Sequence, residues 1–190
     1  MRQLLSDERI DTSIKGGLER TETPLELARK LHRTRADRRG IIEMLEQFIY
    51  ERAMQKYGSP WQSEPPLNLA LKAGDEDAID VLLAGGEDRR SEDPNKVNQY
   101  GQNALHMAAL KGCRLPLFDR ILEKIEDVNA VTTTGFTALM IAAYNNHLDM
   151  VVSLHYTLGI DVNVQAGHYH YTALHQAVNG NFHAIGRQLL

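Results

Sequence analysis

GFTALMIAAYNNHLDMVVSLHYTLGIDVNV, residues 135–164, decides the fold of this chain because its parts recur on both sides at nearly constant spacing. The leucine that follows the turn is Leu139, and the equivalent Leu105 and Leu174 lie 34 and 35 residues away from it. A fixed period in this range is typical of proteins built from stacked repeats. The sequence therefore predicts an array of short structural units.

The same apolar and small positions surround each of these leucines. The matching segments read NALHMAA at 103–109, TALMIAA at 137–143 and TALHQAV at 172–178, and TPLELA at 23–28 and PPLNLA at 65–70 extend the pattern upstream. Asp-Val-Asn occurs at 127–129 and 34 residues later at 161–163, and Val-Asn at 97–98 is a shorter echo. The period thus covers nearly the whole chain.

This pattern resembles the ankyrin repeat family, whose T-P-L-H-x-A signature is met most closely at 172–177 and 103–108. Alanine replaces the proline of the signature in the three downstream units, and the two upstream units lack its histidine. The resemblance implies an all-α solenoid of helix-turn-helix units joined by β-hairpin-like turns. It also implies that His106 and His175 orient their turns through hydrogen bonds.

The residue types independently favour helical hairpins. Thr137 and Thr172 can accept hydrogen bonds from the first N–H groups of a helix, and Pro24 and Pro66 stand where a helix tolerates a missing N–H. Small side chains would let neighbouring first helices approach closely, at positions Ala108, Ala109, Ala142, Ala143 and Ala177. The apolar stripe of a second helix would come from Met150, Val151, Val152 and Leu154.

The unit boundaries follow from this register. We expect the tail of a preceding unit at 1–18, an elongated unit at 19–60, a unit at 61–98 with a charged surface insertion at 89–96, units at 99–131 and 132–165, and a last unit at 166–190 that is truncated in its second helix. The elongated unit reflects a spacing of 42 residues between Leu25 and Leu67. Because terminal repeats usually have a polar outer face, we expect another segment or partner to cover the C-terminal edge.

The composition restricts the class of partner. With 43% hydrophobic residues among 190, the chain can bury a sizeable core, and a net charge of −4 gives no case for nucleic acid or an anionic membrane as partner. Neither a long apolar span nor a secretory signal is found, and the one cysteine, Cys113, suggests packing in a reducing compartment. We expect a cytoplasmic protein that binds another protein and needs no cofactor or small-molecule substrate.

No sequence pattern indicates an enzyme. The chain lacks GxxxxGK[ST], GxSxG, HExxH and CxxC, and Cys113 and His106 fall on different predicted helices, which is weak ground for a nucleophile and its base. A metal site formed by His168, His170 and His183 is an alternative to their being loop residues, although no carboxylate or thiol completes the set. We expect no metal.

The strongest local charge signal is a basic cluster between positions 29 and 39. Six positive charges occur within eleven residues, opposed only by Asp37: Arg29, Lys30, Arg33, Arg35, Arg38 and Arg39. We interpret the cluster as a solvated loop between helices. Binding of an acidic protein surface, phosphate or RNA is the alternative, and it would give an affinity that falls steeply with salt.

In the resemblance, turn tips and exposed first-helix positions form a concave binding face. These positions are Gln99, Tyr100, Gln102, Leu110 and Lys111 in one unit, Thr133, Thr134, Phe136, Tyr144 and Asn145 in the next, and His168, Tyr169, Tyr171 and Asn179 in the last. Aromatic side chains supply rigid contact area; the alternative is that Tyr100 or Phe136 packs on a neighbouring turn. A second interpretation of the whole chain is an accessory domain of an enzyme or secreted bacterial effector whose catalytic domain lies beyond Leu190.

Asn129 and Asn163 each follow Asp-Val at the mouth of a turn. In the resemblance, such an asparagine ties adjacent turns together, and it is also where cytosolic asparaginyl hydroxylases modify these repeats. Those enzymes favour a leucine eight residues upstream, where this chain has Ile121 and His155. We therefore predict a structural role for both asparagines, with Asn129 the better of two poor substrates.

Overall fold

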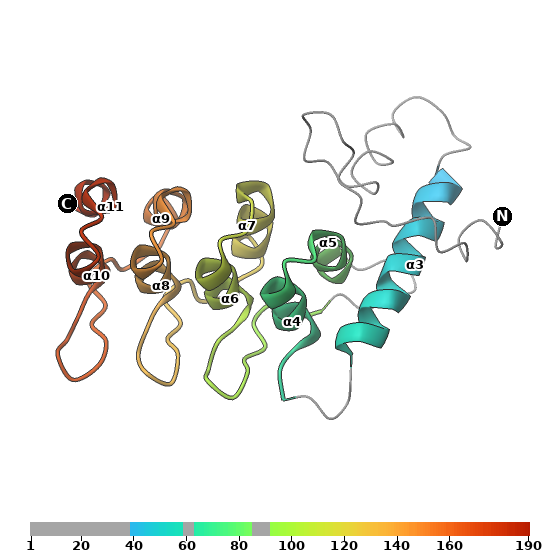
Figure 1. The fold of residues 1–190 in the computed structure, drawn as a ribbon, viewed down its shortest axis with the longest axis horizontal. Coiled ribbons are helices and arrows are strands. Elements are labelled where there is room, and N and C mark those ends of the chain that lie inside the picture. Colours follow the sequence, from blue (N-terminus) through green and yellow to red (C-terminus); the bar gives the residue numbers. More distant parts are fainter. Residues whose placement is uncertain (1–38, 59–62, 85–91) are drawn as a thin grey trace.

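The computed structural model describes residues 39–58, 63–84 and 92–190 (Figure 1). The helices in these ranges are α3 (Arg39–Tyr57), α4 (Pro66–Ala73), α5 (Glu76–Ala84), α6 (Ala104–Lys111), α7 (Leu115–Leu122), α8 (Ala138–Tyr144), α9 (Leu148–His155), α10 (Ala173–Asn179) and α11 (His183–Gln188). Figure 1 shows successive helix pairs side by side, with the long α3 at one end. The predicted all-α solenoid is confirmed.

Some predictions fall outside this part of the chain. The tail at 1–18, the helix expected from residue 23 and the basic cluster up to Arg38 all precede the described residues. The second helix of the elongated unit is α3, and its 19 residues confirm the predicted extra length. Its side chains Ala53 and Tyr57 are buried, and the Tyr57 hydroxyl donates a hydrogen bond of 3.0 Å to Asp75.

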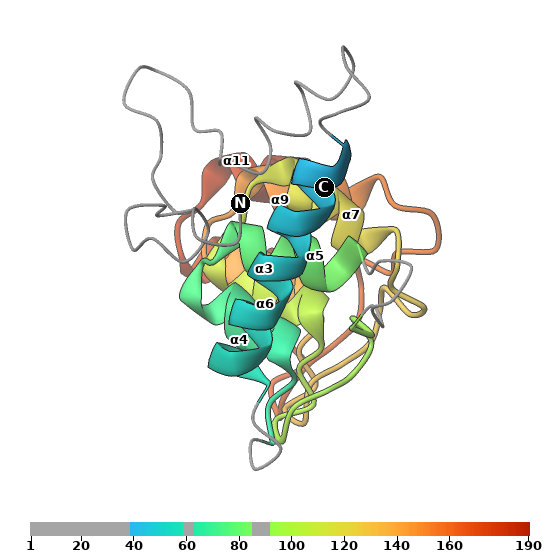
Figure 2. The same cartoon turned by 90° about the vertical axis from the view of Figure 1, so that its right-hand side faces the viewer.

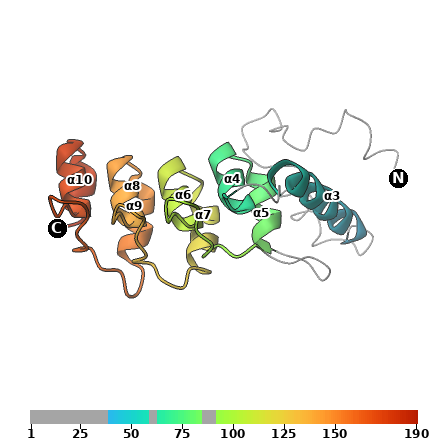
Figure 3. The ribbon, with the colours of Figure 1, turned by 90° about the horizontal axis from the view of Figure 1, so that it is seen from below.

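The helix pairs form two layers. The first helices α4, α6, α8 and α10 pack on one another in one row, and α5, α7, α9 and α11 form a second row (Figures 1 and 3). The close approach of the first helices depends on small side chains that are buried in the structure, as predicted: Ala108, Ala109, Ala142, Ala143 and Ala177. The second row supplies the bulky part of the core, with Phe118, Ile121, Leu154 and Ile185 all 0% exposed. The solenoid therefore has a continuous core between its two rows.

Capping residues set where the helices begin and end. The side chain of Asn103 accepts the His106 N–H at 3.1 Å, and Thr137 accepts the Met140 N–H at 3.3 Å, as expected of N-caps. Gly112 ends α6 with φ of +74°, and a Cβ there would lie 2.6 Å from the ring of His147. Glycine at 112 is thus required both by the backbone and by the neighbouring unit.

A hairpin-like turn precedes each of the first helices α6, α8 and α10. The N–H of Asn98 donates to the carbonyl of Gln102 at 3.0 Å, and the N–H of Thr132 donates to Phe136 at 2.9 Å. In the last turn Ala166 and Tyr171 exchange two such bonds, of 2.8 and 3.0 Å. Figure 1 shows all three turns on the same side of the array.

A second set of turns, between one helix pair and the next, is joined by asparagine amides. The Asn129 amide donates to the carbonyl of Gly159 and accepts the N–H of Asp161, both at 2.8 Å. Asn95 makes the same pair of bonds one unit earlier, to the carbonyl of Lys124 at 3.1 Å and the N–H of Glu126 at 3.0 Å. The predicted role of Asn129 in tying adjacent turns is confirmed.

This register corrects two predictions. The unit at 61–98 was expected to carry an insertion at 89–96, but Asp93-Pro94-Asn95 is the regular turn, 34 residues before Asp127-Val128-Asn129. Residues 89–91 lie outside the described ranges. The Val-Asn echo at 97–98 is also wrong, because Asn98 belongs to the hairpin-like turn. Proline in place of valine and the flanking charges hide the Asp-x-Asn signal.

Asn163 differs from Asn95 and Asn129. Its N–H donates to Asp161 at 2.9 Å, but across the described residues no hydrogen bond involves its side-chain amide, which is exposed. The expected bridging role of Asn163 is therefore not met here. Hydroxylation of either asparagine stays a prediction, and the doubly bonded amide of Asn129 favours its structural role.

Replacing Asn129 by alanine should lower the free energy of unfolding by about 1–3 kcal/mol, because the carbonyl of Gly159 and the N–H of Asp161 lose their partner. Asn163→Ala is the matched control and should change stability by only a few tenths of a kcal/mol, about the limit for surface substitutions. Urea unfolding of the two variants beside the parent chain measures both values. Equal losses would show that the Asn129 bridge does not stabilise the array.

Candidate partner-binding groove

A hollow of about 250 Å³ lies between two hairpin-like turns and the ends of α6 and α8. Its walls combine aromatic, aliphatic, hydroxyl and amide side chains from two successive units: Tyr100, Gln102, Leu110, Thr132, Thr133, Thr134, Phe136, Ile141, Tyr144 and Asn145. We call this hollow the groove. It is the place where the structure brings residues of the predicted concave face together.

Most of the predicted positions in the two middle units line the groove. They are Tyr100, Gln102, Leu110, Thr133, Thr134, Phe136, Tyr144 and Asn145. Gln99 and Lys111 are exposed but do not line it. Sequence reasoning missed Thr132 and Ile141; the signal for Thr132 is its place 34 residues after Asn98, at the start of the same turn.

The turns hold the aromatic side chains in place through their backbones. The N–H of Tyr100 donates to Asn98 at 3.0 Å, and its carbonyl accepts the N–H and hydroxyl of Thr133 at 2.9 and 3.2 Å. Tyr100 and Tyr144 are 57% and 64% exposed, whereas Phe136 is half-buried and packs against the core. The packing alternative thus holds for Phe136, and the two tyrosine rings face solvent.

Buried amides support the groove from beneath. The side chain of Asn98 donates to Glu64 at 3.0 Å and to the side chain of Gln102 at 3.1 Å, and it accepts the N–H of Gln102 at 3.0 Å. Asn68, one unit earlier, donates to the carbonyl of Gln102 at 2.9 Å. Because buried amides with several partners fix a single arrangement, the wall near Gln102 is pre-organised.

His106 connects the turn at the start of α6 to the following unit. Its Nε2 lies 3.0 Å from the carbonyl of Ala130, and the N–H of Asn103 donates to its Nδ1 at 3.3 Å. In the last unit the N–H of Thr172 donates to Nδ1 of His175 at 3.2 Å, while the Thr172 hydroxyl lies 2.9 Å from the same atom. Both histidines therefore make the turn hydrogen bonds that the resemblance implies.

Burial lowers the pKa of His106 below its ordinary value of 6.5, although the carbonyls of Ala130 and Phe136 act in the opposite direction. The unfolded chain thus binds more protons here, so stability should be complete above pH 6.5 and should fall as the pH drops through that value. His106→Gln should reduce this acid-side loss, and His168→Gln, in an exposed turn, should retain it. Urea unfolding at several pH values measures the difference; parallel curves for parent and His106→Gln would contradict it.

The last unit contributes a separate aromatic stack rather than further walls of the groove. The rings of Tyr169 and Tyr171 are stacked at 5.6 Å, and Tyr171 stacks on His175 at the same centroid distance. His168 and Asn179 are exposed and lie outside the groove lining. The turn at 166–171 is one residue longer than its predecessors, and His170 takes a positive φ of 53°. This extra residue separates the last turn from the pattern of the others.

The alternatives for metal and nucleophile chemistry gain no support. Over the residues that the structure describes, no group of three or more metal-ligating side chains forms, so His168, His170 and His183 are not brought together. Burial raises the pKa of the Cys113 thiol to about 12, and a protonated thiol is a poor nucleophile. Cys113 is partly buried against the core, as predicted for a packing residue.

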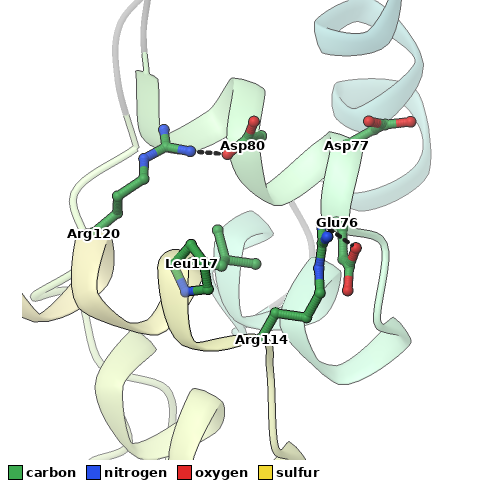
Figure 4. A pocket seen from close by; sticks show the side chains of 7 residues that line it. Glu76, Asp77, Asp80, Arg114, Leu117 and Arg120 are labelled. Carbon is green, nitrogen blue, oxygen red and sulfur yellow. Dashed lines mark hydrogen bonds and ion pairs between the residues drawn. The ribbon is translucent and has the colours of Figure 1, made fainter. Parts of the chain in front are cut away.

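A second, smaller hollow of about 90 Å³ lies between α5 and α7 (Figure 4). Arg114 pairs with Glu76 at 2.7 Å, and Arg120 pairs with Asp80. Each pair joins one unit to the next, and exposed pairs of this kind contribute about 0–1 kcal/mol. Its charges are matched in opposite pairs, so this hollow reads as an interface between units.

The comparison with known families agrees with this architecture. The family model described as ankyrin repeats (3 copies) matches residues 67–166 and residues 113–190, which together span more than half of the chain. No curated protein matches the sequence. Within the described ranges, no helix has the length and apolar character needed to cross a membrane. The chain belongs to the ankyrin repeat family.

Proposed function

We propose that this chain is a non-catalytic protein-binding module and that its partner docks in the groove. Ankyrin repeats are generally protein-interaction modules. The observation that carries the assignment to this surface is the placement of two exposed tyrosine rings, Tyr100 and Tyr144, on opposite walls of one hollow. Tyrosine is enriched among residues that dominate binding energy because it offers rigid apolar area and a hydroxyl.

The rigidity of the groove supports the same proposal. The backbone of Tyr100 is bonded on both its N–H and carbonyl sides, and the Asn145 side chain is bonded to the carbonyl of Ile141 at 2.8 Å. A surface that is already ordered loses less conformational entropy when a partner binds. The groove therefore combines contact area with pre-organisation.

A single substitution tests the assignment. The Tyr144→Ser chain should capture its partner from a lysate of the source cells at least tenfold less efficiently than the parent chain, the loss of about 1.4 kcal/mol expected for one hot-spot ring. Tyr156→Ser is the matched control, since Tyr156 is an exposed tyrosine at the end of α9 and outside the groove. The captured partner is then purified and its affinity measured by calorimetry. Equal retention by all three chains would rule out the groove as the binding site.

A further inference from the structure

The charged residues between positions 97 and 190 are distributed unequally. The three hairpin-like turns, 97–103, 131–137 and 165–172, contain no Asp, Glu, Lys or Arg, and the helices α6, α8 and α10 add only Lys111. All the others lie on the second row of helices or on the connections to it: Arg114, Asp119, Arg120, Glu123, Lys124, Glu126, Asp127, Asp149, Asp161 and Arg187. Figure 2, a view along the array, shows the hairpin-like turns gathered on one side.

The interior of the groove has the same uncharged character. None of its lining residues is Asp, Glu, Lys, Arg or His, and Lys111 is exposed but does not line it. An ionised side chain placed there would lose water and gain no opposite charge. Its volume of about 250 Å³ lies below the range of about 300–1,000 Å³ usual for drug-sized ligands. An apolar side chain of a protein is the occupant that this interior fits.

The polar groups of the walls indicate how the rest of the partner segment is held. Amide and hydroxyl side chains line the groove beside the rings, among them Gln102, Thr134 and Asn145. An extended chain brings backbone N–H and C=O groups that need such partners, whereas a helix satisfies its own. The wall chemistry thus favours an extended segment.

The stacked units set the spacing of a second contact. Packed helices lie about 8–10 Å apart and an extended chain rises about 3.3 Å per residue, so roughly three residues pass each unit. A segment anchored between Tyr100 and Tyr144 would therefore reach the last unit about three residues later. There Tyr169, which is 79% exposed, ends the aromatic stack with Tyr171.

We propose that the partner contributes an extended, uncharged peptide segment with one large apolar or aromatic side chain in the groove and a second, about three residues away, on Tyr169. This inference rests on the proposed function and specifies the chemistry of the partner. Binding then depends on apolar burial and backbone hydrogen bonds, so it is insensitive to ionic strength.

A random peptide library displayed on phage tests the proposal with the native chain as target. Enriched peptides should be poor in Asp, Glu, Lys and Arg and should carry two apolar side chains about three residues apart. Their affinities should change less than twofold between about 0.05 and 0.5 M salt. Tyr144→Lys should lower these affinities at least tenfold, and Tyr156→Lys, outside the groove, should not.

The outcomes separate this inference from the proposed function. Peptides that need Tyr144 but are rich in charge, or that lose affinity steeply with salt, would overturn the inference and leave the groove as a binding site. Peptides indifferent to Tyr144→Lys would overturn the inference, and the lysate capture then decides the proposed function separately. Methylation of one backbone nitrogen next to the anchor should weaken a selected peptide at least tenfold; an unchanged affinity would refute the extended backbone.

Discussion

The chain that carries Tyr100→Ala, Phe136→Ala, Tyr144→Ala and Tyr169→Ala is expected to lose partner binding by at least a hundredfold, or about 2.7 kcal/mol. Three of these side chains line the groove and the fourth ends the aromatic stack of the following unit. Truncating several aromatic contacts removes the residues that usually dominate an interface. Calorimetry with the captured partner measures the loss.

The same variant needs a test of its fold, because Phe136 is half-buried against the core. Cooperative urea unfolding should persist, and the chain that carries only Phe136→Ala separates any loss of stability from the loss of binding. Retained affinity in the fourfold variant would refute the concave face as the binding surface.

Phe118→Ala is expected to lower the free energy of unfolding by about 3–5 kcal/mol, the range for a fully buried phenylalanine. The Phe118 side chain is 0% exposed in α7, between the two rows of helices. Leu115→Ala is the control in the same helix; Leu115 is 38% exposed, so its loss should be far smaller. Because repeat arrays can unfold in parts, circular dichroism and tryptophan fluorescence should be compared. A loss below about 1 kcal/mol for Phe118→Ala would show that α7 is not part of the cooperative core.

The sequence predicted the fold because each unit repeats its own local chemistry. N-caps such as Asn103 and Thr137, and the paired alanines that follow them, recur at the period of the array. The regular turn at Asp93-Pro94-Asn95 was missed, since proline and neighbouring charges are also typical of a surface loop. Only its hydrogen bonds to Lys124 and Glu126, about one unit away, distinguish the two interpretations.

The candidate site was predicted less completely. Position in the repeat was enough to identify Tyr100 and Tyr144, because their exposure follows from the register of turn and helix. The extra residue in the last turn changes the local backbone, with His170 at a positive φ, and Tyr171 stacks on Tyr169 and His175. Such stacking depends on side-chain geometry that a pattern of residue types does not encode.

The hydrogen bonds between units have a consequence for how this gene can change. The bonds from Asn68 to Gln102, from Thr133 to Tyr100 and from Asn129 to Gly159 join residues 34, 33 and 30 positions apart, so each reaches only into the adjacent unit. An in-frame duplication or deletion of one complete period would remake the same bonds at the new junction. Arrays of this kind can therefore change length during evolution while every remaining interface keeps its chemistry.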